Sequence, residues 1–215
     1  MNRREFITLL GGAAAWPLAA QAQQRERMRR VAVLMSFGAD DAEGQSRVTA
    51  FAQGLQELGW SEGRNLRVEY RWAAGNADNI RKYAAELVAT KPDVIVGSGT
   101  PTVTSLEQAT RTVPVVFVQV TDPVGAGVVE SLARPGGNVT GFTNIEYSLS
   151  GKWLELLKEI APAVRRAAVL RDPISAAGIG QFAAIRSVAN SLGVELRPVG
   201  VHDSGEIERG IIAAA

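Results

Sequence analysis

The sequence predicts an α/β fold in which parallel βαβ units form two lobes, with the second lobe incomplete. Three observations lead to this prediction. Short apolar runs alternate with amphipathic stretches of helical length from residue 30 onward. Most of these runs are continuously apolar, as in strands that are covered on both faces, and Gly or Pro residues mark the junctions between segments. Strands alternating with helices of this length are typical of parallel sheets with right-handed crossovers.

The first predicted lobe covers residues 30–145 and begins with a buried strand over 30–35. Residues 65–72 alternate strictly between polar and apolar side chains, which predicts a strand near a sheet edge with one wetter face. The other predicted elements of this lobe are helices over 43–58, from 78, over 101–109 and from about Gly125 to Leu132, and strands over 94–96, 115–118 and 139–142.

The second predicted lobe covers residues 146–215 and opens with an amphipathic helix over 150–160. Its apolar face is formed by Trp153, Leu154, Leu157 and Ile160. A strand over 167–170, a helix over 175–192, a strand over 194–201 and a helix from Ser204 follow. Since a two-stranded parallel sheet covers its own faces poorly, we expect this chain to be the front part of a longer protein. We also expect it to be less stable than that parent and to bind solute only weakly.

The first 22 residues are typical of a secretory signal peptide. A charged start is followed by a short apolar run over 7–20 and by a small-x-small cleavage site that ends at Ala22. The adjacent Arg3 and Arg4, followed by x-Phe-Ile, resemble the twin-arginine export motif. The alternatives are an ordinary Sec signal or an amphipathic helix that stays attached. We therefore expect cleavage near Ala22, a short leader over 23–29, and a mature protein in the periplasm.

Composition restricts the partners and the chemistry of the mature chain. Without Arg3, Arg4 and Glu5, the 23 basic and 22 acidic residues become 21 of each, so no basic excess favours nucleic acid. The chain has no cysteine, which excludes disulfides, thiol nucleophiles and a lipid-attachment cysteine. No segment after the signal peptide is apolar for long enough to cross a bilayer, so we expect a protein that is not embedded in the membrane.

Small polar residues follow several predicted strands, at the edge of the sheet where ligands bind in open parallel sheets. Residues 97–102 (GSGTPT) combine glycines that allow close backbone approach with a helix start that favours a carboxylate or phosphate. Plain capping of a short helix by Thr100 explains the same residues equally well. The candidate ligand-binding residues are Ser36, Phe37, Ser98, Gly99, Thr100, Thr121, Asp122, Asn144, Asp172 and Ser175.

Structural roles also explain several of these residues. Asp122 and Asp172 each precede a proline at a strand-to-helix junction, which is also typical of a helix N-cap. A dinucleotide fingerprint lacks its third glycine, and Asp40, Asp41 and Glu43 suit charge compensation at a helix start better than a metal site.

The sequence offers little support for a catalytic site. His202 is the only histidine, and neither a Gly-x-Ser-x-Gly elbow nor a Walker loop occurs. We expect no enzyme, cofactor or metal. An exported flavodoxin-like or hydrolase-like enzyme and a ligand-sensing domain without a transporter remain the alternatives.

Seven segments of the chain match the pattern of a known family: 30–34 (RVAVL), 51–60 (FAQGLQELGW), 65–71 (NLRVEYR), 91–97 (KPDVIVG), 114–117 (PVVF), 121–127 (TDPVGAG) and 134–142 (RPGGNVTGF). Through them the chain, from about residue 28, resembles the periplasmic substrate-binding proteins of ABC transporters, in the tryptophan/tyrosine-type branch. The resemblance implies a type I binding fold with two lobes that close on a small organic solute, such as an amino acid or an aromatic compound. It also implies an ABC permease and an ATPase as partners. Asp172 and Pro173 stand where the family usually has Asn-Pro, and an ionised carboxylate can only accept hydrogen bonds.

Overall fold

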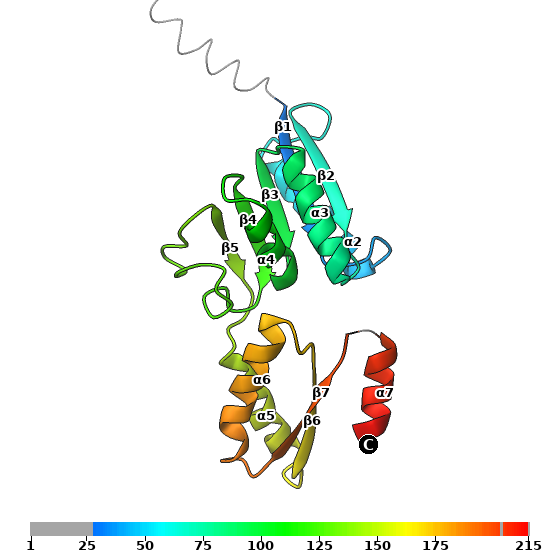
Figure 1. Cartoon of the computed structure of the whole chain (residues 1–215), viewed down its shortest axis with the longest axis vertical. Coiled ribbons are helices and arrows are strands. Elements are labelled where there is room, and N and C mark those ends of the chain that lie inside the picture. Colours follow the sequence, from blue (N-terminus) through cyan, green and yellow to red (C-terminus); the bar gives the residue numbers. More distant parts are fainter. Residues whose placement is uncertain (1–27, 203, 215) are drawn as a thin grey trace, which may run out of the picture.

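The computed structural model describes residues 28–202 and 204–214. In this part the chain forms two α/β lobes, joined where it leaves the last strand of the first lobe and enters the first helix of the second (Figure 1). The predicted signal peptide, its cleavage site near Ala22 and most of the leader lie outside the described residues. No helix among the described residues is long and apolar enough to span a bilayer.

The first lobe is built on a five-stranded parallel sheet with the order β2-β1-β3-β4-β5. The predicted edge strand is confirmed, since β2 pairs with β1 on one side and ends the sheet. The order reverses between β1 and β3, which makes their carboxyl ends the topological switch point of the sheet. The elements are β1 (Arg29–Met35), α2 (Ala42–Glu57), β2 (Leu66–Trp72), α3 (Ala77–Ala89), β3 (Val94–Ser98), α4 (Thr100–Ala109), β4 (Val115–Val120) and β5 (Val139–Thr143).

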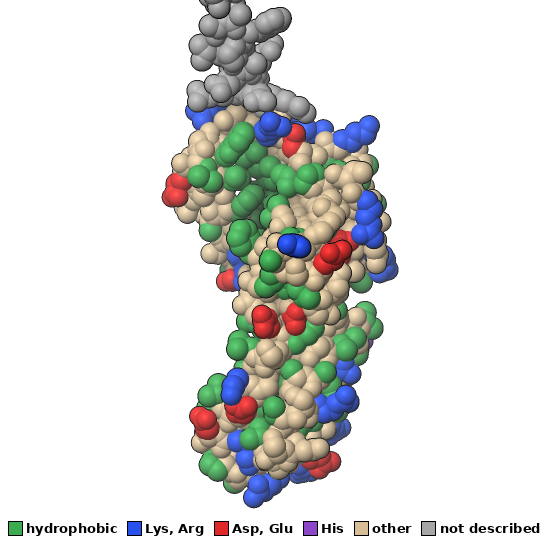
Figure 2. Space-filling view, turned by 90° about the vertical axis from the view of Figure 1, so that its left-hand side faces the viewer, with side chains coloured by type: hydrophobic (Ala, Val, Ile, Leu, Met, Phe, Trp, Pro, Cys, Tyr) green, Lys and Arg blue, Asp and Glu red, His purple; other side chains and the backbone are tan. Residues whose placement is uncertain are grey.

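Helices cover the two faces of this sheet unequally. On one face α3 and α4 pack over a sealed core that includes Leu34, Ile95 and Phe117, each at most 1% exposed. On the other face α2 packs over the β1 and β2 side of the sheet through Val48 and Phe51. Beyond α2, over β3, β4 and β5, an apolar groove of about 420 Å³ stays open. Figure 2 shows hydrophobic side chains gathered around a hollow on this lobe.

The helix predicted from about Gly125 to Leu132 is wrong, because this stretch forms turns. A single helical turn does form, in which the Ala126 N–H donates to the Asp122 carbonyl at 2.8 Å. Gly127 then adopts a φ of 74°, outside the right-handed helical region, and the turn cannot propagate. Two glycines within three residues make helix formation costly here.

The second lobe contains a two-stranded parallel sheet with helices on both faces (Figure 1). One face packs on α5 and α6 around Leu154, Ile185, Ala189 and Val194. On the other face the Arg197 guanidinium donates to the Ala213 carbonyl of α7. The elements are α5 (Leu149–Ile160), β6 (Arg166–Arg171), α6 (Ala176–Ala189), β7 (Glu195–Gly200) and α7 (Ser204–Ala214).

The predicted amphipathic helix at the start of this lobe is confirmed as α5, but its apolar face is only partly covered. Leu154 is buried at 4% exposure, whereas Ile160 is 83% exposed and Trp153 is 47% exposed. Helix periodicity is set by the local sequence, and the covering of the face depends on how many neighbours pack against it. The predicted α/β fold of two parallel lobes is confirmed.

Candidate ligand-binding cleft

The carboxyl ends of β1 and β3 meet at the switch point of the first sheet. Gly99 has a φ of 93°, a conformation that side chains other than glycine rarely adopt. A Cβ atom at Gly99 would lie 3.3 Å from Ser36 Oγ, and the Gly99 N–H donates to the Val118 carbonyl at 3.0 Å. The ends of β1, β3 and β4 are therefore drawn together at this point.

Helix α4 starts here without a side-chain cap. Gly99 occupies the N-cap position, so the expected capping role of Thr100 is wrong, and Thr100 becomes the first helical residue. Thr100 is buried at 6% exposure, and Pro101 fits the first turn because it needs no hydrogen-bond acceptor there. A helix start that no side chain caps retains the positive end of its dipole for an anion.

A cavity of about 290 Å³ lies between this helix start and the second lobe, which is near the lower end of the size range of small-molecule pockets. It brings together three of the predicted site residues, Thr100, Asp172 and Ser175. The first lobe contributes Gly75, Ala77, Ile80, Arg81, Thr100, Pro101, Thr104, Ser105 and Ala126, and the second lobe contributes Asp172, Ile174, Ser175 and Ala176.

The two predicted residues of the second lobe stand at the start of α6. One carboxylate oxygen of Asp172 accepts from the Ile174 N–H at 3.0 Å, and the same oxygen lies 3.7 Å from Nδ1 of His202. Ser175 is the N-cap residue of α6, yet its hydroxyl does not make the capping hydrogen bond. A carboxylate and a hydroxyl of this lobe therefore border the cavity.

Three other predicted residues lie at the junction between the lobes and do not line this cavity. Asp122 accepts from the Gly125 N–H at 2.7 Å and from the Tyr147 N–H at 3.4 Å. Asn144 accepts from the next backbone N–H, that of Ile145, at 2.9 Å, and Thr121 is 9% exposed. The polar groups of Asp122 and Asn144 are engaged in holding the connection between the lobes.

The remaining predicted residues lie elsewhere around the sheet. Ser98 is 2% exposed and borders the apolar groove on the α2 face. Phe37 packs on the cluster under α2, with the Arg47 guanidinium 5.1 Å from its ring centre. Side chains alternate between the two faces of a sheet, so residues that follow strands at one edge still separate onto different sides.

Sequence reasoning missed most of the cavity residues that come from helices. Arg81 and Thr104 lie inside α3 and α4, and the prediction considered only the residues that directly follow strands. Thr104 lies four residues after Thr100, and Arg81 lies four residues after Ala77, so each shares a helix face with a residue at the cavity mouth. That spacing was the signal that could have found them.

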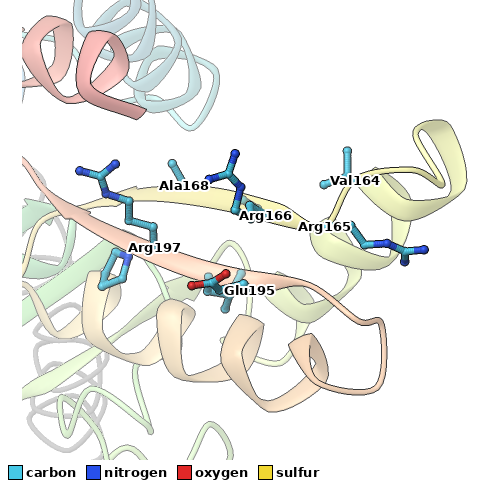
Figure 3. A pocket seen from close by; sticks show the side chains of 9 residues that line it. Val164, Arg165, Arg166, Ala168, Glu195 and Arg197 are labelled. Carbon is cyan, nitrogen blue, oxygen red and sulfur yellow. The ribbon is translucent and has the colours of Figure 1, made fainter. Parts of the chain in front are cut away.

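A larger hollow of about 620 Å³ lies at the amino ends of β6 and β7 (Figure 3). It is bordered by Arg165, Arg166, Arg197 and Glu195, and Figure 3 shows the last three along the two strands and Arg165 just before β6. Ligands of open parallel sheets bind at the opposite, carboxyl ends. The smaller cavity between the lobes is therefore the better candidate site. Within the described ranges, no group of three or more His, Asp or Glu side chains could hold a metal ion.

Comparison with known proteins also supports a ligand-binding function. A family model described as ABC transporter substrate binding protein matches residues 31–214. A tyrosine-binding protein of Clostridioides difficile (strain R20291) is 29% identical over 161 residues, which are 75% of this chain and 46% of that protein.

Solved structures share the fold of this chain. A conserved domain protein of Vibrio cholerae aligns with a TM-score of 0.78 at 34% identity, and an ABC domain of Streptococcus pneumonia in complex with L-Trp aligns with 0.77 at 25% identity. Each alignment covers 87% of this chain and 62% of the other chain. A leucine-binding protein of Thermotoga maritima, at 13% identity and a TM-score of 0.63, shares the fold alone. The predicted type I binding fold is confirmed, and the chain spans about half to three fifths of the length of these relatives.

Proposed function

Because the chain belongs to the ABC transporter substrate binding protein family, we propose that it binds a small organic solute between its two lobes. The cavity at the switch point, bordered by both lobes, is the observation that carries this proposal. Membership of this family favours a binding role over a catalytic one. The partners we propose are a transmembrane permease and a cytosolic ATPase, which would receive the solute from this protein.

The solute class we propose is an amino acid with an apolar or aromatic side chain. Asp172 borders the cavity from one lobe, and Arg81, whose guanidinium also pairs with the Asp78 carboxylate, borders it from the other. Ile80 and Ile174 supply apolar surface. A carboxylate and a guanidinium on opposite sides match the two charges of a zwitterion. The start of α4 offers a second site for the solute's carboxylate. The tyrosine-binding relative and the L-Trp complex support the same class.

Calorimetric titration and thermal unfolding with L-tryptophan and L-tyrosine test this function. We expect saturable binding with a Kd weaker than about 1 μM, since the open cavity buries little of the solute. A solute present at 100 times its Kd should stabilise the folded chain by about 2.7 kcal/mol. The absence of both heat and stabilisation at millimolar concentrations of either amino acid would contradict the proposal.

Two variants connect the binding to this cavity. Asp172→Asn retains the oxygen that accepts from the Ile174 N–H but removes the charge, so we expect affinity to fall about tenfold or more. Ser187→Ala is the matched control on the same helix, because Ser187 is exposed and its hydroxyl bonds only the Ala184 carbonyl. Equal affinities of Asp172→Asn and Ser187→Ala would move the site away from this cavity.

We also propose export to the periplasm through the twin-arginine route, with cleavage near Ala22. The double substitution Arg3→Lys and Arg4→Lys should leave uncleaved precursor in the cytoplasm, because the export machinery reads the paired arginines. Fractionation and immunoblotting measure the precursor and the mature form. Normal accumulation of the mature form in the periplasm would leave Sec as the route.

A further inference from the structure

Tyr147 lies in the segment that connects β5 to α5, where the chain passes from the first lobe to the second. Its ring contacts a glycine from each lobe. A Cβ atom on Gly125 of the first lobe would lie 2.9 Å from Cε2 of this ring. A Cβ atom on Gly180 in α6 of the second lobe would lie 2.3 Å from the same atom and 2.6 Å from Cζ. The ring therefore fills a slot whose two walls are bare backbone.

The first lobe holds the backbone of this segment through Asp122. The Asp122 N–H donates to the Ile145 carbonyl at 2.8 Å, and its carboxylate accepts from the N–H groups of Gly125 and Tyr147. Asp122 has a φ of 44°, in the left-handed region that is uncommon for side chains other than glycine. These hydrogen bonds fix the position at which the Tyr147 ring enters the slot.

The hydroxyl of Tyr147 is buried and has no hydrogen-bond partner among the described residues. Burial raises the pKa of this phenol, and the negative charge of Asp122 raises it further, so the group stays neutral at physiological pH. The hydroxyl contributes no bond to the present arrangement of the lobes. The contact of Tyr147 with the second lobe at this point is made by the ring itself.

We propose that Tyr147 is a positioning residue whose ring is wedged between Gly125 and Gly180 and sets the angle between the two lobes. Gly180 lies in the same helix as Ala176, which borders the cavity, and Gly125 precedes Ala126, which borders it from the other side. A change in the slot therefore changes the width of the cavity. The link to solute affinity rests on the proposed function, whereas the wedge itself does not require a solute.

Distance measurements between spin labels in the solute-free protein test the wedge. The chain has no cysteine, so Lys82→Cys in α3 and Glu159→Cys in α5 provide one exposed labelling site in each lobe. In this labelled background Gly180→Ala should displace the mean distance between the lobes, because the added methyl group meets a rigid ring.

Gly151→Ala is the matched control. It makes the same change on a buried helical glycine of the second lobe, where the new Cβ atom would lie 3.5 Å from its nearest neighbour, Val188. We expect the distance to stay unchanged in this variant. An unchanged distance in folded Gly180→Ala would overturn the proposal.

Substitutions of Tyr147 distinguish the effect of its ring from other effects of Gly180→Ala on α6. In a Tyr147→Ala background, Gly180→Ala should no longer displace the distance, since the obstacle is gone. A displacement of equal size in that background would assign the effect to the helix and refute the wedge.

If Gly180→Ala does not fold, the distance distributions of Tyr147 variants test the proposal. Tyr147→Ala should broaden the distance distribution, whereas Tyr147→Phe should keep the wild-type distribution because it retains the ring. Identical distributions for wild type, Tyr147→Ala and Tyr147→Phe would also refute the proposed wedge. A failure of L-tryptophan and L-tyrosine to bind would contradict the proposed function and leave these distances unaffected.

Discussion

Both lobes are built from parallel βαβ units, but their hydrophobic cores differ in how completely they are shielded from solvent. In the first lobe Leu34, Leu87, Ile95 and Leu106 are entirely inaccessible to solvent. Among the described residues of the second lobe, the best-buried hydrophobic one is Ala189, at 3% exposure. A five-stranded sheet has interior strands with neighbours on both sides, whereas each strand of a two-stranded sheet is an edge. The comparison teaches that local sequence patterns build both lobes, and that the number of strands in the sheet decides how much apolar surface is removed from water.

The second lobe should therefore open more readily than the first, since fewer buried contacts hold it. Hydrogen exchange read out by mass spectrometry can follow both lobes in one sample. Amides of β3 and β4 should exchange more slowly than amides of β6 and β7. Equal protection of the two sheets would show that the chain unfolds as one cooperative unit.

The largest effect is expected from truncating the centre of the first lobe. Phe117→Ala should cost about 3–5 kcal/mol of the free energy of unfolding, because Phe117 is 1% exposed and lies in the sealed core under α3 and α4. Urea denaturation followed by circular dichroism measures this loss. The loss should appear in the exchange of β1, β3 and β4 and leave α5 and α6 unchanged.

The corresponding change in the second lobe should have a smaller effect. Leu154→Ala should cost about 2–3 kcal/mol, near the lower limit for such truncations, because the partly open lobe can collapse around the missing atoms. The same denaturation experiment measures it. A larger loss for Leu154→Ala than for Phe117→Ala would reverse the ranking of the two lobes.

Exposed apolar surface on α5 should promote association between molecules. Ile160 is 83% exposed at the end of this helix, so Ile160→Lys should change the unfolding free energy by less than about 0.5 kcal/mol. The same variant should raise the protein concentration at which light scattering begins, because a charge interrupts the apolar face. An unchanged onset of scattering would indicate that another surface controls association, such as the apolar groove over β3, β4 and β5, which Phe142 borders.

The smallest effect on the free energy of unfolding is expected from a carboxylate in α4, on the well-packed face of the first sheet. Burial raises the pKa of Glu107 in α4, and the nearby Arg111 opposes this shift. Glu107 therefore favours the folded state most at pH values below its unfolded pKa, and this contribution is lost as the pH rises through the raised folded pKa. Glu107→Gln should match the wild type near pH 4 and become slightly the more stable variant at pH 7. Denaturation at both pH values checks this, and a loss of stability at pH 7 would contradict it.

The sequence predicted those parts of the fold that depend on local patterns. The alternation of residues 65–72 identified β2 as an edge strand, and the spacing of Trp153, Leu154 and Leu157 identified α5. The helix around Gly127 was predicted wrongly. The conformation there is decided by a positive φ and by hydrogen bonds that the carbonyls of Asp122 and Pro123 accept, which no periodicity reveals.

The sequence predicted the candidate site less completely than it predicted the fold. Residues at strand ends were found, and Thr100, Asp172 and Ser175 border the cavity. Arg81 was missed because its position depends on how α3 lies against the second lobe. The hydrogen bonds of Asp122 with Gly125 and Tyr147 depend on a contact between the turn after β4 and the segment between the lobes, which a single sequence does not encode in any short motif.

The central claim is that solute binds between the lobes, and backbone NMR with L-tryptophan tests it most directly. Titration into isotopically labelled protein should shift the amide signals of Thr100, Ser105 and Ser175, which border the cavity from both lobes. The signals of Arg166 and Arg197, in the outer hollow, should stay in place. Shifts confined to the outer hollow, or to one lobe alone, would contradict the account.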